Sequence, residues 1–241
     1  MLRIIPYFFA ANILVAIPSS AVAQTWQHQG KPAQVIELFT SEGCSSCPPA
    51  DQYLSEFQDK KTLWQEYIPV AYHVDYWNYL GWEDKFASAA FSQKQRLYKA
   101  YGVTSGVYTP GFIVDGSEWR GYFNWLERSL PESAGNERPL LELEKQGDEY
   151  SILYEKRGEY IAHIILLAMD EVTQVKAGEN KGKLLEHDFV VLYEGNMKAS
   201  SKWHFTIPER HLVAKADAVA VWLTKPGSFK PEQTVAGWIK P

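Results

Sequence analysis

Cys44 and Cys47 are the residues whose type and spacing most directly indicate chemistry, and they are the only cysteines in the chain. They follow an apolar run at 35–39 and precede a segment of helical character at 50–57. A Cys-x-x-Cys pair between a strand and a helix is typical of a redox site, because the spacing lets the sulfurs form a disulfide within one turn. A cysteine at a helix N-terminus is also favoured as the thiolate, the nucleophile of disulfide exchange. The sequence therefore predicts a Cys44–Cys47 disulfide in which Cys44 attacks and Cys47 resolves.

Two other uses of the cysteine pair stay open. A structural disulfide across so short a loop gives little entropic stabilisation, because that effect grows with loop length. A zinc site would need two further ligands. His73 could approach in space, whereas His204 and His211 lack the close spacing of a zinc-binding pair. We expect redox chemistry that needs neither a metal nor an organic cofactor.

Thr109 and Pro110 lead into another apolar run, at 112–114. A cis X-Pro bond costs only about 0.5–1 kcal/mol. The arrangement resembles thioredoxin folds, which keep a cis proline facing the cysteines before such an apolar strand, and this resemblance implies that the Thr109–Pro110 bond is cis and that both residues would align an incoming peptide. An ordinary trans proline in a turn is the alternative.

Three further residues are candidates for the site. Glu37 shares a strand face with Val35, by the two-residue period. If that face is inward, burial would raise the pKa of Glu37, and its carboxylate could take the proton of the second thiol. A glutamate facing water at a strand edge is the alternative. Trp77 and Trp82 belong to an aromatic, acidic loop that would line a substrate groove, or would cover the core instead.

The composition indicates a globular protein that does not bind nucleic acid. Hydrophobic residues make up 46% of the 241 residues and charged residues 22%, which is ordinary for a folded domain. The net charge is −5, and no basic block stands out as a nucleic-acid contact.

The N-terminus predicts export. A positive start at Arg3, an apolar run at 4–17 and the small residues at 21–23 match a signal peptide over residues 1–23. The run is short for a membrane span, which needs about 20 apolar residues, and a retained anchor is the alternative. We expect a periplasmic or secreted protein without a stable membrane span after cleavage. Disulfides persist in such compartments, and the expected partners are exported protein thiols or disulfides and a redox partner protein.

The pattern of apolar runs changes along the chain. Residues 24–130 predict the order β-α-β-α-β-β-α of an α/β layered domain, with a closing helix at 124–130. Residues 131–139 suit a linker, and residues 140–241 contain short apolar runs separated by turn signals. The predicted fold class is an α/β thioredoxin-like domain followed by an all-β antiparallel sandwich-like domain.

The segment 39–51, FTSEGCSSCPPAD, resembles the signature of a bacterial family of exported thioredoxin-fold proteins of unknown function. Segments similar to its other blocks lie at 73–77, 80–82, 107–110 and 178–182. The resemblance implies a thioredoxin-like domain and a C-terminal β domain, without implying a substrate. Within the wider thioredoxin-like superfamily, it implies that Cys44 attacks, that Cys47 resolves and that Pro110 is the cis proline, while Glu37 roughly matches the buried acid.

Together these observations predict an exported thiol–disulfide oxidoreductase that acts on protein cysteines through the CSSC motif. The alternative is a non-catalytic binding module with a structural disulfide, in which the aromatic loop and the β domain bind a partner. Reactivity separates the two, because only a redox site would exchange electrons reversibly and trap partners.

Overall fold

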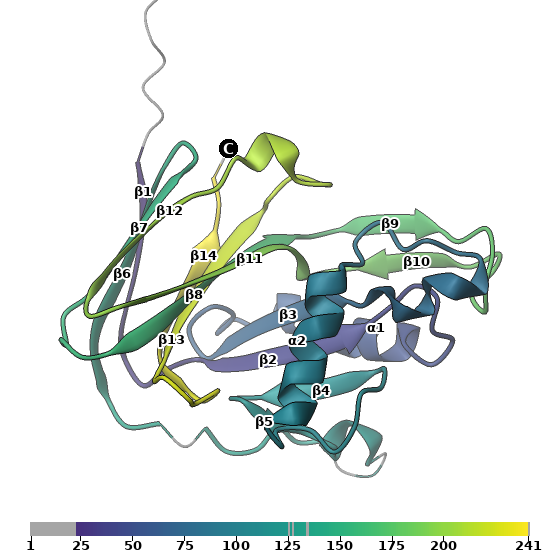
Figure 1. The fold of residues 1–241 in the computed structure, drawn as a ribbon, viewed down its shortest axis with the longest axis horizontal. Helices are drawn as coiled ribbons and strands as arrows, with labels where there is room; N and C mark the ends of the chain where they lie inside the picture. Colours follow the sequence, from purple (N-terminus) through teal and green to yellow (C-terminus); the bar gives the residue numbers. More distant parts are fainter. Residues whose placement is uncertain (1–22, 125, 127, 134, 241) are drawn as a thin grey trace, which may run out of the picture.

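Strands dominate the regular structure of this protein (Figure 1). The computed structural model describes residues 23–124, 126, 128–133 and 135–240. Apart from Ala23, the predicted signal peptide lies outside the described residues. The helices and strands, in chain order, are β1 (Gln24–Gly30), β2 (Gln34–Thr40), α1 (Pro48–Ser55), η1 (Glu56–Asp59), β3 (Tyr67–His73), η2 (Asp75–Leu80), α2 (Ala89–Ala100), β4 (Gly111–Val114), β5 (Ser117–Glu118), η3 (Gly121–Phe123), β6 (Arg138–Gln146), β7 (Glu149–Tyr154), β8 (Tyr160–Ala168), β9 (Glu171–Gln174), β10 (Leu184–His187), β11 (Val190–Ala199), β12 (Lys202–Thr206), η4 (Glu209–His211), β13 (Ala218–Thr224) and β14 (Pro231–Trp238).

An eight-stranded sheet runs through the molecule in the order β14-β13-β8-β11-β3-β2-β4-β5. The β2–β3 and β3–β11 pairs are parallel, and the other neighbours are antiparallel. The junction between β3 and β11 is small: Val190 is in register with Ala71, and the Ala71 amide donates to the carbonyl of Phe189 at 2.8 Å. A four-stranded sheet, β1-β6-β7-β12, and a two-stranded hairpin, β9–β10, complete the strand pairing of the described residues.

The predicted fold class, an α/β thioredoxin-like domain followed by an all-β antiparallel sandwich-like domain, is wrong. The large sheet takes strands from both 24–130 and 140–241, and β1 pairs with β6 across the same division. Only α1, of 8 residues, and α2, of 12, are α-helices in the described chain. The predicted closing helix is also wrong, since the described positions between 124 and 130 are not helical. Hydrophobic periodicity locates a strand but does not identify its partner, and the free edge of β3 pairs with a strand more than a hundred residues away.

The two α-helices cover opposite faces of β2 and β3, with α2 in front and α1 behind in Figure 1. Side-chain contacts agree with this arrangement, because successive residues of a strand point to opposite faces. Tyr53 of α1 packs against Phe112, the register partner of Leu38. Tyr98 of α2 packs against Phe39, the next residue of β2. Residues of one strand therefore belong to different surroundings according to their parity.

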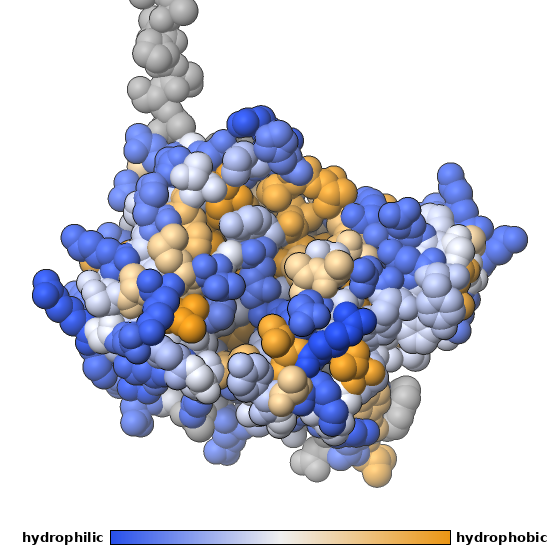
Figure 2. Space-filling model, in the orientation of Figure 1, coloured by the Kyte–Doolittle hydropathy of each residue, from blue (hydrophilic) through white to orange (hydrophobic). Residues whose placement is uncertain are grey.

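Apolar side chains form two main cores. One lies around β2, β3 and both helices, and the other fills the space between the eight-stranded and four-stranded sheets, where Leu141 and Trp203 meet Ile164 and Val221. On the face shown in Figure 2, hydrophilic residues dominate the rim and hydrophobic residues gather near the centre, beside α2. Within the part of the chain that the structure describes, no helix is long and apolar enough to cross a membrane.

Candidate functional site

The two cysteines form a disulfide at the start of α1. Their Cα atoms are 5.4 Å apart, and the turn that joins them is closed by a hydrogen bond from the Cys47 amide to the Cys44 carbonyl, at 3.2 Å. Cys47 is the N-cap of α1, with two prolines after it in the first turn. The predicted disulfide is therefore confirmed, whereas the helix is capped by Cys47 rather than Cys44.

Both cysteines are buried, although exposed residues lie between them. Cys44 is 1% exposed and Cys47 is 0% exposed, whereas Ser45 and Ser46 are open to solvent. The Cys44 sulfur lies 3.4 Å from the Ser46 hydroxyl. The Cys44 sulfur thus lies next to an exposed side chain but is itself covered, so a large molecule could contact it only after a local movement.

Trp77 links the cysteine loop to the proline loop. Its indole N–H donates to the Thr109 hydroxyl at 2.7 Å, and a Cβ atom added to Gly43 would lie 3.0 Å from the Cβ of Trp77. The absence of a side chain at Gly43 allows this close approach. The Thr109–Pro110 bond is cis, as predicted, and Pro110 is buried. The structure thus brings together Trp77, Thr109 and the loop that carries Cys44.

The β9–β10 hairpin holds the cysteine loop from the other side. The buried amide of Asn180 donates to the carbonyls of Glu42 and Cys44, at 2.8 and 2.9 Å. The carboxylate of the neighbouring Glu179 accepts from the Ser45 amide at 3.0 Å. Lys183 donates to the Asn180 side-chain oxygen at 2.8 Å and so orients the amide. A turn more than 130 residues from the CSSC motif therefore fixes its backbone.

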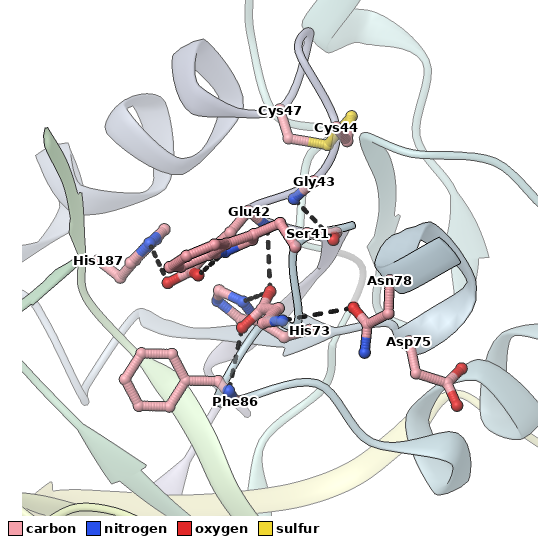
Figure 3. Close-up of polar contacts among 12 residues, drawn as sticks. Ser41, Glu42, Gly43, Cys44, Cys47, His73, Asp75, Asn78, Phe86 and His187 are labelled. Carbon is pink, nitrogen blue, oxygen red and sulfur yellow. Dashed lines mark hydrogen bonds and ion pairs between the residues drawn. A yellow bond between two sulfur atoms is a disulfide. The ribbon is translucent and has the colours of Figure 1, made fainter. Parts of the chain in front are cut away.

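A buried set of polar side chains lies beneath the disulfide (Figure 3). His73, at the end of β3, contacts Asp84 at 2.7 Å. Glu42 accepts a hydrogen bond from the Trp82 indole at 2.7 Å, and its other oxygen lies 3.4 Å from His187 of β10. The rings of His73 and His187 are 5.0 Å apart. Titratable groups from four separate segments therefore meet in a space that solvent barely reaches.

The electrostatics of His73 and Asp84 indicate an ion pair. Burial opposes the charge on His73, but attraction to Asp84 and their hydrogen bond outweigh it and raise the pKa of His73. Burial also opposes the charge on Asp84, but His73 and the amides of Glu42 and Phe86 hold the pKa of Asp84 below its ordinary value. The amide of Glu42 donates to Asp84 at 3.0 Å. The ion pair thus anchors the backbone two residues before Cys44.

The structure does not bring Glu37 to this set. Glu37 is buried, and burial raises its pKa, as the sequence suggested. Its carboxylate, however, faces α2, where it accepts hydrogen bonds from the Tyr98 hydroxyl at 2.9 Å and pairs with Lys94 at 3.3 Å. Because α1 covers the opposite face of β2, the sheet separates Glu37 from α1 and from its N-cap, Cys47.

The buried polar set was only partly foreseeable from the sequence. His73 ends an apolar strand and Asp84 follows the aromatic loop, and both positions gave a signal. Glu42 and Asn180 lie in the segments 39–51 and 178–182 that resemble blocks of the family, but nothing in the sequence indicates that they meet each other or His187, because these residues are distant in the chain. No three histidine, cysteine or carboxylate side chains of the described residues are arranged to hold a metal ion.

The fold and the site together define a mostly-β protein whose only two cysteines close a disulfide over a buried acid–histidine cluster. The chain belongs to the DUF1223 family, described as proteins of unknown function, whose family model matches residues 35–224. The resemblance to a family of unknown function is therefore confirmed, whereas its placement in the thioredoxin-like superfamily is not.

Comparison with solved structures gives one informative neighbour. A crystal structure of a protein from Agrobacterium tumefaciens matches with a TM-score of 0.60 and 29% identity, covering 86% of this chain and 94% of that chain. HBP35 of Porphyromonas gingivalis matches with a TM-score of 0.46 and 12% identity, covering 86% of this chain and 75% of that one. The second similarity is too low to support an argument. No curated protein matches the sequence.

Proposed function

We propose that this protein carries out thiol–disulfide exchange on protein cysteines through Cys44 and Cys47. The observation that carries the proposal is a disulfide between cysteines with a sequence separation of 3. It lies at the start of a helix and above buried titratable groups. A bridge over so short a loop adds little stability. Titratable groups beneath a disulfide can exchange the protons that its reduction and re-formation require. The proposal depends on this local chemistry and not on the fold class predicted from the sequence.

Cys44 is the proposed point of attack, and Cys47 is the proposed resolving residue. The Cys44 sulfur is next to the exposed Ser46, whereas Cys47 begins the buried face of α1. When the reduced protein acts on a substrate disulfide, the Cys44 thiolate attacks one sulfur of that bond and forms a mixed disulfide, and the other substrate sulfur leaves as a thiolate. The Cys47 sulfur then attacks the Cys44 sulfur and releases the substrate as a thiolate. Trp77 and Thr109 are the proposed contacts of the substrate beside Cys44, and Trp82 orients Glu42 below it.

The burial of both cysteines supports a second candidate, a binding module whose disulfide is structural. Chemical trapping separates the two candidates. The Cys47→Ser variant should accumulate mixed disulfides with added protein substrates, because its resolving thiol is gone. Cys44→Ser should accumulate none and serves as the matched control. In reduced wild-type protein at mildly acidic pH, iodoacetamide should label Cys44 before Cys47. Slow, equal labelling together with no trapping by Cys47→Ser would establish the structural role instead.

We also propose that the protein acts after export, in the periplasm or outside the cell. The signal-like segment at 1–23 supports this proposal, and a compartment that preserves disulfides suits the Cys44–Cys47 bond. Mass spectrometry of the protein from its native host should find a mature chain that begins at Gln24. A chain that retains Met1 in the membrane fraction would contradict the cleaved form.

A further inference from the structure

We infer that Asp51 is the proton acceptor and donor for the Cys47 sulfur, an assignment that rests on the proposed thiol–disulfide exchange. A redox cycle at this site needs a proton carrier, because Cys47 is fully buried and must pass between a thiol and a thiolate. The carrier has to lie near the sulfur and also have access to water. Asp51 meets both conditions.

The helix places Asp51 beside Cys47. Cys47 has helical backbone angles, φ −79° and ψ −38°, and the Asp51 amide donates to the Cys47 carbonyl at 3.0 Å. Residues four apart on a helix share a face, with Cβ atoms about 5–6 Å apart. The side chains of Asp51 and Cys47 therefore leave α1 on the same side. One water molecule can bridge two polar side chains at this Cβ spacing.

The Asp51 carboxyl group is suited to carrying a proton. Asp51 is 6% exposed, and its Oδ1 atom has no hydrogen-bond partner in the described part of the chain. Burial raises the pKa of Asp51, and the charges of His187 and His73 only partly oppose this effect. A carboxyl group with a raised pKa exchanges its proton closer to neutral pH, which is the condition for general acid–base catalysis.

Charged groups from several elements lie around Asp51. His73 comes from β3, His187 from β10, and Asp84 and Glu42 from the loops above, while Glu186 and Asp188 lie at the rim of the neighbouring cavity. The nearby buried atoms His73 Nε2 and His187 Nδ1 also lack hydrogen-bond partners within the described residues, whereas His187 Nε2 and Glu42 Oε1 lie 3.4 Å apart as an ion pair. Unpaired buried polar atoms that cluster in this way are the usual setting of ordered water.

A cavity gives this cluster a route to solvent. Its volume is about 350 Å³, and it lies between α1 and β10. Asp51 and His187 line it, together with Pro48, Gln52 and Leu185. A water molecule needs only roughly 10–15 Å³ of such space, so water in the cavity can reach the carboxyl group without crossing the disulfide.

After Cys44 has formed a mixed disulfide, the Asp51 carboxylate takes the proton of the Cys47 thiol. The Cys47 sulfur attacks the Cys44 sulfur, a new S–S bond forms, and the bond from Cys44 to the substrate breaks. The substrate sulfur leaves with the electron pair, and Asp51 passes the proton to water in the cavity. In the reverse reaction, a substrate thiolate attacks the Cys44 sulfur and displaces Cys47. The protonated Asp51 then supplies the proton that the departing Cys47 thiolate takes up.

The test mixes reduced full-length protein with excess dithiobis(nitrobenzoate) and follows the coloured thiolate by stopped flow. Attack by Cys44 releases one thiolate, and resolution by Cys47 releases a second. In Asp51→Asn the first release should be retained, while the second should slow about 100-fold at pH 7, the loss expected without a general base. The remaining rate should rise about tenfold per pH unit, since hydroxide must replace the carboxylate. Asp59→Asn, an exposed carboxyl just beyond α1, is the matched control.

Each outcome decides the assignment. An unchanged second release in Asp51→Asn overturns it, and slowing by Glu37→Gln alone would instead support the buried acid suggested by the sequence. If wild-type protein releases only one thiolate per chain, Cys47 does not resolve, the proposed function itself fails, and the assignment to Asp51 fails with it. If Asp51→Asn does not fold, infrared difference spectra of oxidised and reduced protein supply the readout. A protonated carboxyl band must change with redox state in both wild type and Glu37→Gln, and its absence overturns the assignment.

Discussion

Replacing Asn180 with aspartate should loosen the cysteine loop without creating a cavity. The two side chains have the same shape, but aspartate at neutral pH donates no hydrogen bond. The Glu42 carbonyl would lose its donor, and the Cys44 carbonyl would keep only the Cys47 amide, in a site where Asn180 is 0% exposed. A buried polar group without a partner costs about 1–3 kcal/mol. We therefore expect the free energy of unfolding to fall by about 2–4 kcal/mol.

Urea unfolding of the oxidised protein measures this loss. With a slope of about 1–3 kcal/mol per molar urea, the midpoint should fall by about 1 M. Lys181→Ala, at an exposed position of the same turn, should change little. The variant should also be reduced faster by dithiothreitol, by about tenfold for each 1.4 kcal/mol removed from local opening. If Asn180→Asp stays within about 0.5 kcal/mol of Lys181→Ala, the hairpin does not hold the loop as described.

Three other substitutions test the surroundings. The raised pKa of His73 contributes stability below its ordinary value of 6.5 that is lost as the pH rises through the folded-state value. The lowered pKa of Asp84 contributes stability above 3.8 that is lost on acidification, so Asp84→Asn should remove both limbs from the pH profile of urea unfolding. Burial lowers the pKa of His163 to about 3, so unfolding should become easier between pH 6.5 and 3. His163→Leu should flatten this acidic part of the stability profile. An unchanged profile would show that His163 is not the cause of the loss of stability. Gly43→Ala should lower the thermal midpoint and shift the tryptophan fluorescence, because the added Cβ would lie 3.0 Å from Trp77; wild-type values for both would show that the loop has room.

Local features of this protein were largely predictable from its sequence. The apolar run at 35–39 lies within the strand Gln34–Thr40, and the apolar run at 112–114 lies within Gly111–Val114. The disulfide and the cis bond before Pro110 were also expected. Each of these features depends on neighbouring residues, whose types and spacing the sequence displays directly.

Long-range features were not predictable in the same way. The sheet is continuous because of one parallel junction, Val190 with Ala71, in which neither residue is distinctive. Asn180 and His187 join the site only because the β9–β10 hairpin folds back onto α1. The alternation in β2 left open whether Glu37 is buried or faces water, and it could not decide which helix covers each face; the structure buries Glu37. The sequence therefore indicated Glu37 of β2 as the buried acid, whereas the buried acid of α1 is Asp51.

Asn180 and Asp51 act on different steps of the proposed reaction, and a double variant can separate these steps. Asn180 bonds to the backbone of Glu42 and Cys44, so its loss should ease access to Cys44 and speed the first thiolate release. Asp51 lies a turn into α1 beside Cys47, so its loss should slow only the second. The two side chains share no hydrogen-bond partner among the described contacts, and effects at independent sites add as free energies within about 0.5 kcal/mol. In Asn180→Asp/Asp51→Asn, the first release should match the first single variant and the second release the other. If instead the faster opening restores the second release, the Cys47 proton reaches solvent directly when the loop opens, and the cavity beside Asp51 is not its route.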